Sequence, residues 1–222
     1  MIELVKSAVM QAADLGGPVV LVLIATSIAT VAVIFYKLWQ FLRAGVGRHK
    51  ALREAVTAWD AGDRAAARAA LGRSKSYLAP VIDMGFSGQA DDLDRLRSEA
   101  EARFARLERG FRFLDTVSQL APLLGLFGTV LGMIQAFQAL QEAGSQVDPS
   151  ILAGGIWVAL LTTAVGLAVA MPTSMVLSWF ESRMDAERVI ADHAILSVLH
   201  PQGRGAAAAS AEMPVAGQAR HA

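Results

Sequence analysis

Three long runs of apolar residues alternate with charged segments along the chain. The runs cover residues 15–42, 116–141 and 150–180, and the second and third contain no Asp, Glu, Lys or Arg. A helix needs about 20 apolar residues to cross the hydrocarbon core of a bilayer. The pattern therefore predicts an all-α membrane protein with three transmembrane helices.

Small residues gather on one side of the second and third spans when the sequence is wound as a helix, at about 100° per residue. The stripe in the second span comprises Ser118, Ala121, Gly125, Gly128, Thr129, Gly132, Ala136 and Ala139. The stripe in the third span comprises Gly155, Ala159, Thr162, Thr163, Gly166 and Ala170. Because small residues let helix backbones approach closely, the two spans are expected to pack against each other or to line a shared interior.

The threonines in these stripes allow two interpretations. Each hydroxyl can bond to a carbonyl one turn earlier in its own helix, which is the ordinary role of threonine in a membrane helix. Alternatively, Thr129, Thr162 and Thr163 line a polar path between helices. The presence of a stripe in two consecutive spans favours the lining interpretation. The expected helix-packing residues are Gly125, Gly128, Gly132, Gly155, Ala159 and Gly166.

The basic residues predict the orientation of the chain. Only Lys6 precedes the first span, and no Lys or Arg lies between Gln141 and Ser150, whereas most lie between Lys37 and Arg112. Lys and Arg near the ends of spans stay on the cytoplasmic side of the membrane. The N-terminus and a loop over 142–149 are therefore expected in the periplasm, and the C-terminus in the cytoplasm.

The segments outside the spans are expected to be largely helical. Residues 1–14 are expected to form a periplasmic interfacial helix. Residues 43–115 are expected to form a cytoplasmic helical domain. In it, two short helices over 51–59 and 64–71 are joined by a turn over 60–63, and Asp63 is expected to be the N-cap of the second helix.

Two further cytoplasmic helices are expected to continue the spans. A helix over 91–113 is expected to run without a break into the second span. Residues 181–201 are expected to extend the third span as a cytoplasmic helix. Residues 202–222 are mostly small and polar, and we expect them to be disordered.

Composition excludes several classes of protein. The 222 residues are 54% hydrophobic, which favours a membrane protein that interacts with the lipid bilayer. The formal net charge of +0 says nothing about nucleic acid, and no nucleic-acid partner is expected. The chain has no cysteine, and its 4 histidines lack the spacing of metal ligands. No nucleotide-binding, zinc-protease or serine-hydrolase motif occurs. We therefore expect no catalytic residue, metal or cofactor, and no enzymatic activity.

Two motifs resemble those of a known family. They are Ala121-Pro-Leu-Leu-Gly-Leu-Phe-Gly-Thr-Val-Leu-Gly132 and Gly154-Gly-Ile-Trp-Val-Ala-Leu-Leu-Thr-Thr-Ala-Val-Gly-Leu167. Together they resemble the MotA/TolQ/ExbB family of inner-membrane proton-channel subunits. The start of the first span, Gly16-Gly-Pro-Val-Val, and its exit, Lys37-Leu-Trp, look like ExbB. The resemblance covers about residues 15 to 195.

The resemblance implies an assembly and a mechanism. It implies a homo-oligomer, a pentameric bundle of three-span subunits, that encloses single-span partners of the ExbD/TolR type. The partner's membrane aspartate carries the proton, and the complex energises a TonB-like protein that spans the periplasm. By the same resemblance, Thr129 and Thr163 match polar residues near that aspartate, and Pro122 and Pro172 match prolines that flank the two helices.

One departure from the family pattern leaves alternatives open. ExbB and TolQ resemble the pattern Gly-Ile-x-Glu-Ala-Leu at the start of the third span, and Val158 stands here at the glutamate position. The chain is expected not to conduct protons alone. The alternatives are a TolQ-like subunit for envelope maintenance, a MotA-like subunit for flagellar rotation and a membrane scaffold that conducts no protons.

Overall fold

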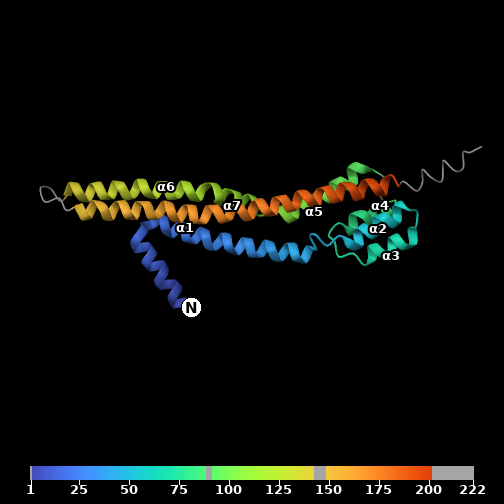
Figure 1. Cartoon of the computed structure of the whole chain (residues 1–222), viewed down its shortest axis with the longest axis horizontal. Coiled ribbons are helices and arrows are strands. Elements are labelled where there is room, and N and C mark those ends of the chain that lie inside the picture. The colour runs from blue at the N-terminus through green and yellow to red at the C-terminus, as the bar shows by residue number, and fades with distance from the viewer. Residues whose placement is uncertain (1, 89–91, 143–148, 202–222) are drawn as a thin grey trace, which may run out of the picture. The chain divides into compact units, whose positions relative to one another are not determined.

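The structure is a computed structural model that describes residues 2–88, 92–142 and 149–201 (Figure 1). Its described part contains helices and no strand, in agreement with the predicted all-α class. The helices are α1 (Ile2–Ala44), α2 (Lys50–Asp60), α3 (Arg64–Gly72), α4 (Ala79–Phe86), α5 (Leu93–Glu108), α6 (Phe111–Glu142) and α7 (Pro149–Leu199). The predicted disordered tail over 202–222 and most of the predicted 142–149 loop lie outside the described residues.

The chain divides into two compact units. Unit 1 comprises Met1–Leu38 and Arg109–Ser182, and thus most of α1, all of α6 and the first part of α7. Unit 2 comprises Trp39–Glu108 and Arg183–Ala222, with the four short helices and the last part of α7.

Among the described residues, three helices are long and apolar enough to cross a membrane. The candidate spans are Gly17–Ala44, Phe111–Glu142 and Leu152–Leu199, which overlap the three predicted spans. Helix α7 has 51 residues, more than twice the roughly 20 that a bilayer requires. Its charge-free part ends at Phe180, and charged residues begin at Glu181.

A break divides α1 into two helical segments. Gly17 has φ 64° and ψ −166°, which is not helical, and Pro18 follows it. Glycine tolerates positive φ, and proline is well suited to the first turn of a new helix because it needs no N–H partner there. The apolar span of α1 therefore begins at this break.

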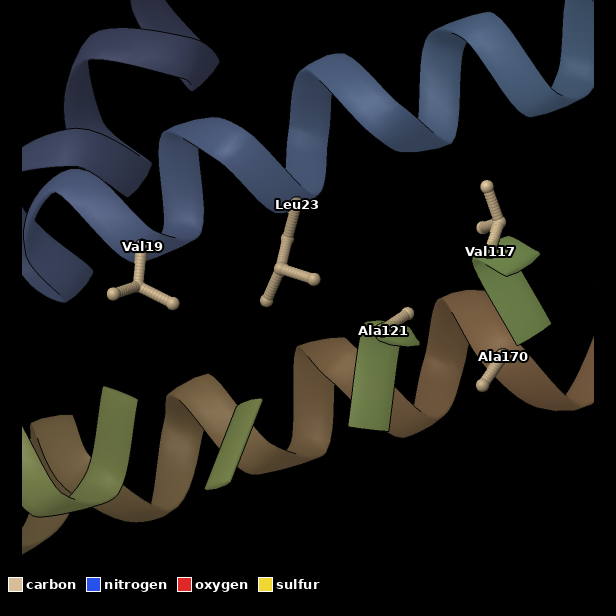
Figure 2. Close-up of a cluster of buried hydrophobic side chains, with 5 residues drawn as sticks. All are labelled: Val19, Leu23, Val117, Ala121 and Ala170. Carbon is tan, nitrogen blue, oxygen red and sulfur yellow. The ribbon is translucent and has the colours of Figure 1, made fainter. Parts of the chain in front are cut away.

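A small apolar core joins the three long helices within unit 1. Figure 2 shows Val19 and Leu23 of α1 facing Val117 and Ala121 of α6 and Ala170 of α7. Leu23 is fully buried, and Ala121 is 1% exposed. Partly buried Leu124 and Leu131 of α6 and Val165 and Val169 of α7 pack against this cluster.

Unit 2 is built on a hairpin of α2 and α3. The Asp63 carboxylate accepts the backbone N–H of Ala66 at 2.9 Å, so it caps α3 as predicted. On α2, the ring of Trp59 stacks on Phe86 of α4 with centroids 4.0 Å apart. The Trp59 indole also donates to the Val198 carbonyl at 3.0 Å, which joins the hairpin to the end of α7.

The predicted continuous helix over 91–113 and into the second span is wrong. Helix α5 ends at Glu108 and α6 begins at Phe111. Between them, Gly110 has φ 97°, in the left-handed region where a right-handed helix cannot continue. Its missing side chain also leaves room for a neighbour, since a Cβ there would lie 3.2 Å from Lys37 Cε.

Candidate functional site

Glycines bring the backbones of α6 and α7 into contact within unit 1. A Cβ added to Gly125 would lie 2.9 Å from the Thr162 carbonyl oxygen, and one added to Gly132 would lie 3.1 Å from Ala159 Cβ. We call this contact the glycine seam. It comprises Gly125, Gly128, Gly132 and Ala136 of α6 and Gly155, Ala159, Thr162 and Gly166 of α7. All six residues expected to pack helices lie in it.

Thr162 is the polar residue of the seam. It is 1% exposed, and its hydroxyl lies 2.7 Å from the Ala159 carbonyl oxygen of its own helix and 3.2 Å from the Gly125 carbonyl oxygen of α6. A hydroxyl has one proton, so these two acceptors share it. Gly128 leaves the space that the Thr162 side chain fills, because a Cβ there would lie 2.6 Å from the hydroxyl oxygen.

The other two candidate threonines differ from Thr162 and from each other. The half-buried Thr129 donates its hydroxyl to the Leu126 carbonyl of its own helix at 2.6 Å, as the ordinary interpretation expects. The Thr163 hydroxyl oxygen is buried and has no hydrogen-bond partner among the described residues. One obvious acceptor, the Ala159 carbonyl one turn earlier, already receives the Thr162 hydroxyl.

Both candidate prolines lie inside long helices. Pro122 is within α6 and Pro172 is within α7. Proline has no N–H, so each leaves the carbonyl four residues earlier without its usual helical partner. Each helix therefore lacks one backbone hydrogen bond at its proline.

The second and third spans supply no acid or base to this site. Residues 116–141 and 150–180 contain no Asp, Glu, His, Lys or Arg, and Val158 is half-buried. No group of His, Cys, Asp and Glu in the described ranges could hold a metal ion. The chemistry available in the glycine seam is hydrogen bonding by the Thr162 hydroxyl and by backbone carbonyls.

Sequence reasoning missed a polar cluster in unit 2. Glu187 of α7 is fully buried with His49 and Tyr77, although the sequence placed Glu187 only in a helical extension of the third span. The residues are far apart in the chain and share no motif. The one available signal was the positioning of Gly45 and Gly47 before His49, since closely spaced glycines indicate a tight turn.

Three apolar helices with a seam of small residues define a helical, multi-pass membrane protein. The sequence model of the MotA/TolQ/ExbB proton channel family matches residues 73–192, which is more than half of the chain. The chain therefore belongs to this family, and its three apolar helices make it a multi-pass membrane protein.

Relatives are found on both the ExbB and the TolQ branches. A protein of Synechocystis sp. named ExbB-like 1, a biopolymer transport protein, is 34% identical over 165 residues, 70% of this chain and 64% of its own length. ExbB of Salmonella typhimurium is 28% identical over 87% of this chain and 84% of its own length. TolQ of Haemophilus influenzae is 42% identical over 80 residues, 36% of this chain and 35% of its own length. The chain thus spans less than two thirds of the first and third relatives.

Proposed function

We propose that this chain is an ExbB-type stator subunit that, with an ExbD-type partner, uses the proton motive force to energise TonB-dependent transport across the outer membrane. Family membership supports a proton-channel subunit, and the similarity to biopolymer transport proteins supports the ExbB type. The observation that carries the proposal is the seam itself. It combines close helix contact and threonine hydroxyls with second and third spans, residues 116–141 and 150–180, that hold no ionisable group.

In this proposal the proton-carrying acid belongs to a partner. A protonatable group inside the membrane is the usual mark of a proton relay, and the second and third spans have none. A single-span protein of the ExbD/TolR type, with one aspartate in its span, would supply it. A homo-oligomer of this chain, a pentamer by family resemblance, would surround the partner with α6 and α7.

Thr163 is the candidate best suited to meet that acid. Its buried hydroxyl has no partner in the described part of this chain, so a rotation about χ1 would cost it no hydrogen bond. Thr129 and Thr162 already donate to carbonyls. Pro122 and Pro172 would let α6 and α7 adjust locally when subunits move.

The proposed location is the bacterial inner membrane, with the N-terminus in the periplasm and the C-terminus in the cytoplasm. Most of the 20 basic residues lie between Lys37 and Arg112, largely in unit 2, which would therefore be cytoplasmic. The long charged end of α7 belongs to the same unit, which supports placing it on the same side.

The first test is purification of the chain from native membranes, with mass spectrometry of the proteins that accompany it. We expect a small single-span protein with one aspartate in its span. A stable oligomer of this chain alone, with no acid-bearing partner, would overturn the proposal and favour a scaffold. The same purification from a strain that lacks this protein is the control for proteins that bind the affinity resin nonspecifically.

A TolQ-type subunit is the second candidate, because a TolQ relative is also among the similar proteins. The two functions predict different defects in a deletion strain. An ExbB-type subunit is needed for energised uptake across the outer membrane, whereas loss of a TolQ-type subunit makes the outer membrane leak. Measuring both defects in one strain separates them.

A further inference from the structure

Glu187, on the last part of α7, is a buried carboxylate outside the apolar spans. It is fully buried within unit 2. Its Oε2 lies 2.6 Å from His49 Nε2 and accepts the Tyr77 hydroxyl at 2.8 Å, while its Oε1 accepts the Gly47 N–H at 2.9 Å. Arg183 Nη2 lies 3.6 Å from Oε1. We call these residues the Glu187 cluster.

The hydrogens of the cluster can be assigned from its geometry. The carboxylate only accepts, so His49 Nε2 carries a proton and donates it to Glu187. The Gly47 N–H also lies 3.2 Å from Nε2, but a protonated Nε2 cannot accept, so this N–H belongs to Oε1. On the other side of the ring, Nδ1 lies 3.2 Å from the Ser76 hydroxyl, which in turn accepts the Leu78 N–H. Each polar atom in this series of hydrogen bonds, from the Leu78 N–H through Ser76 and His49 to the Glu187 carboxylate, therefore has a partner.

The donors come from two turns that are held against α7. One turn follows α1, where Gly45 and Gly47 have φ of 70° and 84°. A Cβ on Gly47 would overlap the Arg183 guanidinium, and one on Gly45 would lie 2.7 Å from the Lys75 carbonyl oxygen. The second turn precedes α4 and holds Tyr77, whose ring also packs edge-on against Phe104 of α5 with centroids 5.9 Å apart.

Electrostatics keeps Glu187 ionised and Tyr77 protonated. Burial alone would raise the pKa of Glu187, but hydrogen bonds from His49 and Tyr77 and the charges of His49 and Arg183 outweigh burial and lower it. Burial, and next the charge and hydrogen bond of Glu187, raise the pKa of Tyr77 despite Arg183 and Arg188. The acceptor and its phenol donor therefore keep these roles near neutral pH.

We propose that the Glu187 cluster is a latch that fixes the rotation of α7 within unit 2. A rotation by one residue is about 100°, which would take the carboxylate away from its donors and leave a buried charge unpaired. Only one rotational setting of α7 satisfies the cluster. If the proposed function holds, Glu187 is also a positioning residue for the proton-driven activity, because the same helix α7 carries Thr162 and Thr163.

Cysteine labelling can measure the rotation directly, because the chain has no cysteine of its own. Val189 is 70% exposed and Ala191 is 3% exposed on the same stretch of α7. Single Val189→Cys and Ala191→Cys variants are labelled with a maleimide in the full-length protein. Their rates are compared with and without Glu187→Gln. The exposed Glu181→Gln on the same helix is the control.

We expect fast labelling at 189 and slow labelling at 191 when Glu187 is present. Glu187→Gln should reduce the ratio of the two rates by at least about tenfold, the effect of losing one charge-assisted hydrogen bond, while Glu181→Gln leaves it unchanged. Tyr77→Phe, which removes one donor only, should give an intermediate ratio. An unchanged ratio in both cluster variants would overturn the latch.

The same variants separate the latch from the proposed function. If energised uptake falls in Glu187→Gln at equal protein level and in proportion to the labelling ratio, the positioning role is supported. If the ratio changes and uptake does not, the positioning role is overturned. If the wild-type chain shows no uptake that a protonophore abolishes, the proposed function fails, and the labelling still decides whether the latch exists.

Discussion

The three threonines of the small-residue stripes have three different hydrogen-bond environments in unit 1. Thr162 bonds across to α6, Thr129 bonds within its own helix, and the hydroxyl of Thr163 is buried without a partner in the described part of the chain. The same substitution at Thr162 and at Thr163 therefore has different expected effects, and each can be checked against the other.

Thr162→Val should destabilise the protein, because it removes a hydrogen bond between helices that is worth about 0.6 kcal/mol on average in a membrane. Thr163→Val should leave stability nearly unchanged but abolish energised uptake. Thermal unfolding in detergent and an uptake assay at matched protein level measure the two effects. Full uptake in Thr163→Val would remove this hydroxyl from the proposed proton path.

Glu187 predicts a pH dependence whose sign follows from its lowered pKa. A carboxyl with a lowered folded-state pKa stabilises the fold above its ordinary value, here 4.5, and loses that contribution as pH falls through the folded pKa. Wild-type protein should therefore unfold at higher denaturant concentration than Glu187→Gln at neutral pH. The difference between the two unfolding midpoints should become smaller at acidic pH. A difference that does not change with pH would show that the charge of the Glu187 carboxylate does not contribute to stability.

At the scale of elements, two neighbouring glycines of α7 provide a matched pair. A Cβ on Gly155 would overlap Ala136, whereas one on Gly154 would meet nothing within 4 Å. Alanine favours a helix over glycine by about 1 kcal/mol, so Gly154→Ala should be neutral or stabilising. Gly155→Ala should cost about 1–3 kcal/mol, because it pushes α6 and α7 apart. Equal melting temperatures of the two variants would contradict close contact between α6 and α7 at Gly155 of the glycine seam.

The elements also mark what the sequence could and could not predict. The stripes around Gly125 and Ala159 were visible because helical periodicity places small residues on one face. The end of α5 was missed because apolar positions keep their helical spacing across Gly110, and only its positive φ breaks the helix. The Glu187 cluster was missed because it depends on tertiary contacts between residues far apart in the chain.

At the scale of the whole molecule, the absence of ionisable residues from the second and third spans has a direct consequence. Purified chain reconstituted alone in liposomes should not dissipate a pH gradient faster than empty liposomes. A trapped pH-sensitive dye measures the rate. Co-reconstitution with the acid-bearing partner is the positive control. Proton flux through the chain alone would place the proton carrier in this protein and contradict the proposal.

The glycine seam also has a mechanical consequence. Where Cα atoms and carbonyl oxygens of two helices touch directly, there are no long side chains between them that could change rotamer and let one helix slide past the other. Packed interiors of this kind resist deformation. Helices α6 and α7 are therefore expected to move together along the seam, and local adjustment is expected outside it, at Pro122 and Pro172 and where larger side chains meet.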